Sequence, residues 1–319
     1  MPQATHPRPE NGAAGFVKGS KTAAARVDSP RLSLPIRYLV VAAVLGAFLF
    51  AYWPTLRELV AAWDKEPDYS HGYLVIPLAA AFLYLRRESM PEVRTGFYWG
   101  GLVLIVASIA LRIAGRALFL SPVDGWSIVL WTAGATWLLL GRRMLWWAAP
   151  AIGFLFFMVP LPFRMETWLS VPLQKIATRL SCWTLQLLGL PALYEGNVIF
   201  LGEHRLFVEE ACSGMRIFIG ILALAYAYLV LVPRAWWEKL LLVASVLPVA
   251  IVANVTRIVV TALLYQLASS EAARHFSHDW AGFIMIPYAA ALFGFVLWYI
   301  GRLFPKVEHV GLGRVMADK

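Results

Sequence analysis

The 319-residue sequence is 60% hydrophobic and only 15% charged. Soluble domains average about 25% charged residues, so the composition indicates an integral membrane protein. The net charge of +9 does not indicate nucleic-acid binding, because the basic residues form short clusters between apolar blocks, where they report topology. Two cysteines, Cys182 and Cys212, are too few for a disulfide scaffold. They lack metal-ligand spacing, and no nucleotide-binding or metalloprotease motif occurs, so no cofactor is expected.

The chain begins with a polar stretch, residues 1–34, that is rich in Pro, Gly, Ala, Ser and basic residues and is predicted to be a disordered cytoplasmic tail. The next block lacks a small-residue cleavage site, which favours a retained anchor over a signal peptide. Since a transmembrane helix needs roughly 20 apolar residues, spans are predicted at 36–53, 71–86, 96–114, 125–140, 144–160, 213–232, 239–266 and 280–301. The prediction is an all-α integral membrane domain at 35–303 with about eight transmembrane helices, followed by a cytoplasmic tail at 304–319.

The orientation follows from the Lys and Arg clusters, which concentrate on the cytoplasmic side of bacterial membranes. With the N-terminus inside, the clusters at 86–94, 142–143 and 234–239 and both tails fall in the cytoplasm. Arg112 and Arg116 are exceptions to this pattern. The prediction is a multi-pass protein of the bacterial inner membrane with both termini cytoplasmic.

The longest segment between spans, residues 161–212, is predicted to lie on the outer, periplasmic side. Its first part places Trp168, Leu173, Leu180 and Trp183 at near-helical spacing, which predicts an amphipathic helix in the membrane interface. Its second part has two short β-like runs joined by Gly-Glu-His-Arg, which predicts a small β-hairpin.

Cys212 follows this hairpin and directly precedes an apolar run, in the stretch "LFVEEACSGMRIFIGI". A helix N-terminus favours the thiolate, which is the nucleophilic form of cysteine. Gly214 removes bulk and allows another chain to approach closely. Two structural alternatives stay open, a buried small hydrophobic residue and a disulfide to Cys182. The preceding Glu209 and Glu210 are candidate contacts for a basic group of a substrate, or a solvated acidic turn.

Arg257 lies inside a long apolar run, and ionisable residues within a membrane are functional candidates by default. Asn254 and Thr261 fall on the same helix face. The alternative is a snorkelling arginine that ends a shorter span.

Two groups of residues, each with at least one histidine, flank predicted spans on the outer side. His275 and His278 precede the last span, and either is a candidate general base or a solvated loop residue. Tyr69 and His71 lie at the outer mouth of the second span, where they line a substrate groove or end a helix. Cys212, Arg257 and His278 map to the same membrane face and supply a nucleophile, a cation and a base for acyl transfer.

Three segments, "VEEACSGMRIF", "NVTRI" and "SHDWAGF", resemble the signature segments of the exosortase family, and "YSHGYLVIPL" and "FMVPLP" resemble its more amino-terminal segments. The resemblance covers about residues 36–301. It implies a membrane cysteine protease or transpeptidase that processes exported proteins and is linked to the surface polysaccharide matrix. The implied substrates end in a sorting signal: a Pro-Glu-Pro motif, a membrane-spanning helix and a basic cluster.

Carried onto this sequence, the resemblance makes Cys212 the nucleophile and matches Arg257 and His278 to the other two catalytic positions. The acceptor of the acyl group is not implied. The competing hypothesis is a non-enzymatic transporter or polysaccharide-export component with Arg257 lining a polar pathway. That hypothesis predicts that Cys212→Ala is tolerated whereas Arg257→Ala is not.

Overall fold

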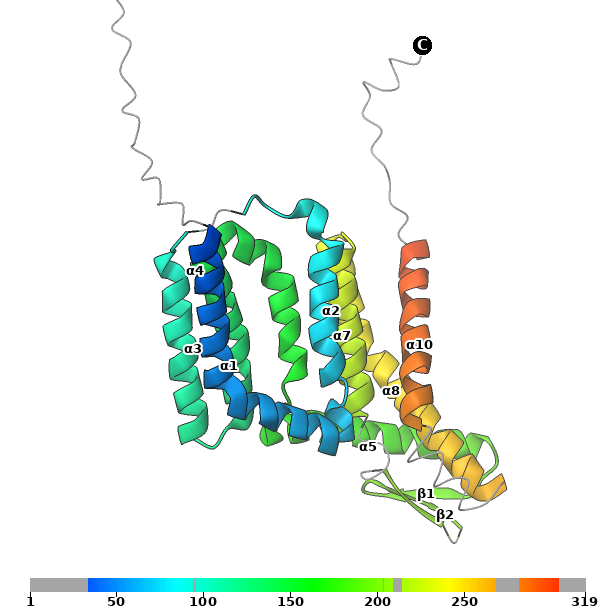
Figure 1. Cartoon of the computed structure of the whole chain (residues 1–319). Coiled ribbons are helices and arrows are strands. Elements are labelled where there is room, and N and C mark those ends of the chain that lie inside the picture. The colour runs from blue at the N-terminus through cyan, green and yellow to red at the C-terminus, as the bar shows by residue number, and fades with distance from the viewer. Residues whose placement is uncertain (1–33, 94–95, 203, 209–213, 268–280, 304–319) are drawn as a thin grey trace, which may run out of the picture.

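A computed structural model describes residues 34–93, 96–202, 204–208, 214–267 and 281–303 (Figure 1). The predicted tails, up to residue 33 and from residue 304, lie outside the described residues. The described chain is mostly helical with one small sheet, as predicted for the fold class. We call the end of the helix bundle where the sheet lies in Figure 1 the sheet end.

Seven helices carry the apolar runs. They are α1 (Leu34–Lys65), α2 (Gly72–Leu85), α3 (Trp99–Ala117), α4 (Ser121–Phe154), α7 (Met215–Leu231), α8 (Trp236–Leu267) and α10 (Ala281–Leu303). Among the described residues, five of them, α1, α3, α4, α8 and α10, are long and apolar enough to cross a membrane. The helices α2 and α7 are apolar but have only 14 and 17 residues. The multi-pass membrane class is therefore confirmed, while the count of eight crossings is not.

The helix α4 combines two of the predicted spans in one element that reverses direction. Gly141 interrupts it with φ 86° and ψ 170°, a backbone conformation that favours glycine. Figure 1 shows the second arm running back beside α2 toward the sheet end. The pair Arg142 and Arg143 lies directly after this reversal, at the end of the bundle away from the sheet.

The helix α1 continues well past its predicted end at residue 53. Pro54 lies inside it, and Figure 1 shows the remaining turns crossing the sheet end of the bundle. This extension buries Thr55, Leu59 and Trp63. The prediction stopped too early because the extension is amphipathic, so its charged residues ended the apolar run.

The segment after α4 contains the predicted amphipathic helix, α5 (Phe163–Leu187). It begins after two prolines, Pro160 and Pro162, and packs against α8. One face, with Leu173, Cys182 and Leu185, is buried, and the other exposes apolar side chains that include Trp168, Trp183 and Leu187. An exposed apolar face of this kind suits contact with lipid.

The predicted hairpin is the larger part of a three-stranded antiparallel sheet with strand order β1–β2–β3. Its strands are β1 (Ala192–Glu195), β2 (Val198–Leu201) and β3 (His204–Phe207). The strands β2 and β3 form the predicted hairpin, and β1 adds a strand that was not predicted. Buried residues of the sheet, Ile199 and Leu201, share a core cluster with Ile258 of α8. The sheet thereby brings the chain that leads to Cys212 back to α8.

Candidate functional site

The structure describes only part of the predicted site. Cys212, His278 and His275 lie outside the described residues, as do Glu209 and Glu210. Four other predicted residues are described, namely Asn254, Arg257, Tyr69 and His71. The geometry of the site is therefore built from these four and their neighbours.

Gly214, two residues after Cys212, is the first described residue of the segment that leads into α7. Its φ of 70° is left-handed, and it immediately precedes the first turn of α7. A Cβ atom at this position would lie 2.9 Å from Asn254 Nδ2 on α8, closer than real Cβ contacts allow without movement. The group that lies against Gly214 is thus the side chain of Asn254, one of the predicted site residues, and the approach of another chain at Gly214 stays a prediction.

Arg257 lies one turn beyond Asn254, well inside α8. Asn254 and Thr261 are buried, and Arg257 is partly buried, so the face predicted for these three residues points into the protein. The Thr261 hydroxyl donates to the carbonyl of Arg257 at 2.9 Å. The helix continues ten residues past Arg257, so this arginine does not end the helix.

Arg216 and Asp68 form an ion pair that the sequence analysis missed. Arg216 lies in the first turn of α7, and its Nε is 3.6 Å from Asp68 Oδ1. Its guanidinium also interacts electrostatically with that of Arg257. Arg216, two residues after Gly214, therefore pairs with a carboxylate from the α1–α2 connection, and the charge of Arg257 on α8 acts on it from nearby. Preorganised cations of this kind stabilise negative charge that develops on a reacting group.

His71 and Tyr69 hold the connection that carries Asp68. The connection contains a 3-10 turn, η1 (Pro67–Tyr69). His71 contacts two carbonyl oxygens, Nδ1 with Asp68 at 3.1 Å and Nε2 with Phe157 at 3.0 Å. Burial lowers the pKa of His71, and this outweighs the opposite effect of the two carbonyls.

The Tyr69 hydroxyl accepts a hydrogen bond from the Leu161 amide at 3.3 Å. Burial, and then the charge of Glu166 on α5, raise the pKa of Tyr69. Burial also raises the pKa of Glu166 itself, as do the nearby carboxylates of Glu66 and Asp68. Both predicted residues thus anchor the turn that presents Asp68 to Arg216, and their assignment to substrate binding stays a prediction.

Comparison with protein families gives one match. The sequence matches the transmembrane exosortase family (Exosortase_EpsH) over residues 63–299, about three quarters of the chain. The protein belongs to the transmembrane exosortases. The match spans every described residue of the site, from Asp68 to Arg257. Comparisons with curated proteins and with solved structures give no match.

The second cysteine of this exosortase is a buried free thiol. Cys182 on α5 is 0% exposed, and its Sγ contacts the carbonyl of Ala192 at 3.4 Å. Burial raises the pKa of this thiol, which disfavours the reactive thiolate. A free Cys182 removes the disulfide alternative for Cys212.

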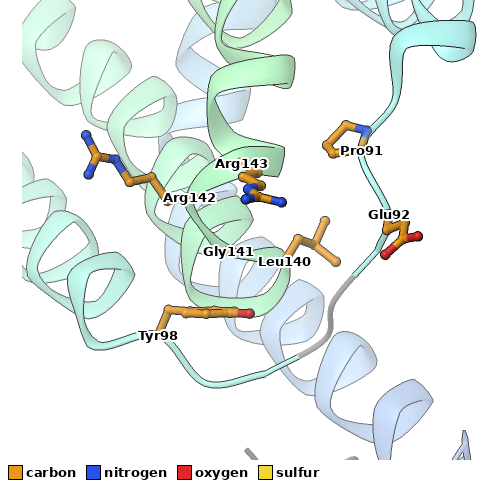
Figure 2. Close-up of a pocket in the computed structure, with 7 residues that line it drawn as sticks. All are labelled: Pro91, Glu92, Tyr98, Leu140, Gly141, Arg142 and Arg143. Carbon is orange, nitrogen blue, oxygen red and sulfur yellow. The ribbon is translucent and has the colours of Figure 1, made fainter. Parts of the chain in front are cut away.

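A cavity of about 430 Å³ lies at the end of the exosortase bundle away from the sheet. It adjoins the reversal at Gly141 and is lined by Pro91, Glu92, Tyr98, Leu140, Gly141, Arg142 and Arg143 (Figure 2). In Figure 2 the Arg142 side chain points away from Glu92. None of the four described candidate residues lines this cavity, so it is separate from the described part of the candidate site.

Proposed function

We propose that this exosortase is a cysteine peptidase or transpeptidase that cleaves C-terminal sorting signals of exported proteins. The observation that carries the proposal is the contact between Gly214 and Asn254, because it brings the segment after Cys212 against the helix that carries Arg257. The family match supports the same activity. A cation beside a thiol nucleophile is what acyl transfer requires.

In the proposed mechanism, the Cys212 thiolate attacks the carbonyl carbon of the scissile peptide, after His278 has taken the thiol proton. Arg257 stabilises the oxyanion of the tetrahedral intermediate, and Arg216 adds to the positive potential. Collapse of the intermediate breaks the C–N bond, and His278 returns the proton to the leaving amine. An amine, a hydroxyl or water then attacks the thioester and releases Cys212.

The proposed topology has eight crossings in the inner membrane, with the two arms of α4 counted separately and with α2 and α7 included. Both termini are cytoplasmic, and the sheet end is periplasmic. Support comes from the basic clusters, since the ends of α2 and α7 and the reversal in α4 lie opposite the sheet in Figure 1. The bulk of a substrate that has crossed the membrane would meet the sheet end. Glu209 and Glu210, which precede the nucleophile, are proposed to contact the substrate.

The test is co-expression with a tagged exported protein that ends in Pro-Glu-Pro, about 20 apolar residues and a basic cluster. We expect wild type to release the apolar helix and Cys212→Ala to release none. Mass spectrometry of the new C-terminus identifies the cleavage site and distinguishes water from another acceptor. Cys182→Ala is the matched control and is expected to cleave normally. Cleavage that persists in Cys212→Ala, in a host without related enzymes, would exclude Cys212 as the nucleophile.

Thiol labelling tests the nucleophile without any substrate. In the folded protein, a small maleimide is expected to label Cys212 and to leave Cys182 unlabelled, since Cys182 is buried. Both cysteines should react after denaturation. Equal labelling of the two thiols in the folded protein would contradict a selectively activated Cys212.

A further inference from the structure

A second cavity of about 430 Å³ lies between α2, α7 and α10. At one end it is bounded by the polar residues Ser70, His71 and Arg216, and the rest of its wall is apolar. The side chains of Leu74, Leu78 and Phe82 line it along α2. We call this cavity the α2–α7–α10 groove.

The groove extends along the helices from the sheet end toward the middle of the bundle. From His71 to Phe82 the rise is about 16 Å at about 1.5 Å per residue, roughly half of a bilayer core. In a membrane protein, an apolar groove of this depth takes an apolar occupant from the lipid phase. An acyl chain and a transmembrane helix both meet that requirement.

The residues of α7 that face the groove favour a transmembrane helix over an acyl chain as the occupant. Gly220, Ala223 and Ala227 follow one another at helical spacing, and α10 contributes Ala289 and Ala290 opposite them. Small side chains let the backbones of two membrane helices approach closely, whereas an acyl chain gains nothing from them. A Cβ atom added at Gly220 meets nothing within 4 Å, so this part of the groove is open space.

The polar end of the groove favours a negatively charged group on the occupant. Arg216 lines it, and the Nε of Arg216 is buried without a hydrogen-bond partner among the described residues. Its ion pair with Asp68 is long, at 3.6 Å. The Nε therefore faces Asp68, and a carboxylate placed at this end would pair with the outer part of the Arg216 guanidinium, whose side chain is 24% exposed.

We propose that the α2–α7–α10 groove binds an apolar transmembrane helix of the substrate and that Arg216 binds a carboxylate just outside that helix. This inference rests on the proposed function. Arg216 is only two residues after Gly214, so a helix seated in the groove presents its flanking peptide to the segment that follows Cys212. The groove would therefore hold the apolar helix of the substrate, while Arg216 holds the acidic residue that precedes this helix on its outer side.

Photo-crosslinking tests occupancy independently of cleavage. A photoreactive amino acid replaces Leu224, which lines the groove and is 40% exposed, in a Cys212→Ala background. Phe295 on α10, which is 61% exposed and does not line the groove, is the matched lipid-facing control. With the tagged probe described above, we expect a crosslink at position 224 at least about tenfold stronger than at position 295. Equal or absent crosslinking at the two positions would overturn the groove assignment.

A steric block tests the same site through activity. Gly220→Leu fills the open space, and Gly46→Leu, at a glycine of α1 that also has nothing within 4 Å, is the control. We expect Gly220→Leu to lower cleavage and crosslinking at least about tenfold and Gly46→Leu to change neither more than about twofold. Normal cleavage by Gly220→Leu would overturn the groove and leave the proposed function intact. A crosslink at position 224 without any cleavage by the Cys212-containing protein would overturn the function and leave the groove intact.

The charge preference is tested by a double exchange. Replacing the probe's Glu with Gln should lower cleavage about tenfold in wild type and have little further effect in Arg216→Gln. Additive losses would show that Arg216 does not bind that carboxylate.

Discussion

Two clusters of arginine and aspartate lie at the sheet end of the bundle, and they differ in how deeply the carboxylate is buried. Asp124 of α4 is 1% exposed and accepts hydrogen bonds from Arg116 Nε at 3.0 Å and Thr55 Oγ1 at 2.9 Å. Arg112 adds an ion pair at 3.6 Å. The side chain of Asp68 is 29% exposed, and its Oδ1 lies 3.6 Å from Arg216 Nε.

The difference separates a buried charge cluster that stabilises the bundle from a partly exposed cluster for which we propose a role in substrate binding. Arg112 and Arg116, the two exceptions to the topology pattern, are explained by Asp124, and Arg112 also lies over the Tyr52 ring at 4.5 Å. The Asp68 cluster instead borders the α2–α7–α10 groove and the segment next to Cys212. A charged residue in an apolar helix is therefore a functional candidate only after its partners are known.

The largest effect is expected for Asp124→Ala. Removing this carboxylate leaves two arginines without their buried partner, which should lower the free energy of unfolding by about 3–5 kcal/mol. Thermal unfolding in detergent measures the loss. Glu58→Ala is the control, because Glu58 is 56% exposed and contacts Arg116 only at 3.8 Å, and such pairs contribute about 0–1 kcal/mol. Equal losses in the two variants would mean that burial of Asp124 contributes no special stability.

The second prediction concerns activity. Arg257→Gln is expected to lower the cleavage rate on the order of 100- to 1000-fold, because the oxyanion loses its cation, while the melting temperature changes little. Arg112→Gln is expected to do the reverse, with a lower melting temperature and normal cleavage per folded molecule. The two are compared by cleavage of the same probe and by thermal unfolding. If both variants lost stability and kept activity, Arg257 would belong with the structural cluster.

The smallest effect is a pH dependence of stability. Burial holds the pKa of His71 below its ordinary value, so the unfolded chain takes up a proton first as the pH falls. The contribution of His71 is therefore complete above about pH 6.5 and declines below it. We expect the melting temperature to fall as the pH drops below about 6.5, and His71→Gln to reduce that slope.

Apolar composition was enough to predict much of the fold. The spans at 96–114, 239–266 and 280–301 correspond to α3, α8 and α10 because long apolar runs have few alternatives in a membrane. The first span was predicted too short, since the turns after Pro54 mix apolar and charged residues. The strand β1 was missed because four residues between Gly and Pro signals carry almost no periodicity.

The sequence predicted the site only where residues close together in the chain form it. Asn254 and Arg257 share a helix face, and their spacing in the sequence alone reveals this. The missing side chain of Gly214 indicates a close contact there, but the sequence does not identify Asn254 as the contacting residue. The pairing of Asp68 with Arg216 joins residues 148 positions apart, and no local pattern encodes that distance. The candidate roles of Cys212 and His278 stay predictions.

The reversal at Gly141 bears on how the protein is made. Without it, α4 would be a straight helix of 34 residues, about 51 Å long at about 1.5 Å per residue, far beyond a bilayer core of about 30 Å. With the reversal, the two arms of α4 form a helical hairpin in which each arm is short enough for the bilayer core. A side chain at position 141 that straightened the hairpin would turn two crossings into one. Every later element would then have the orientation opposite to the one proposed.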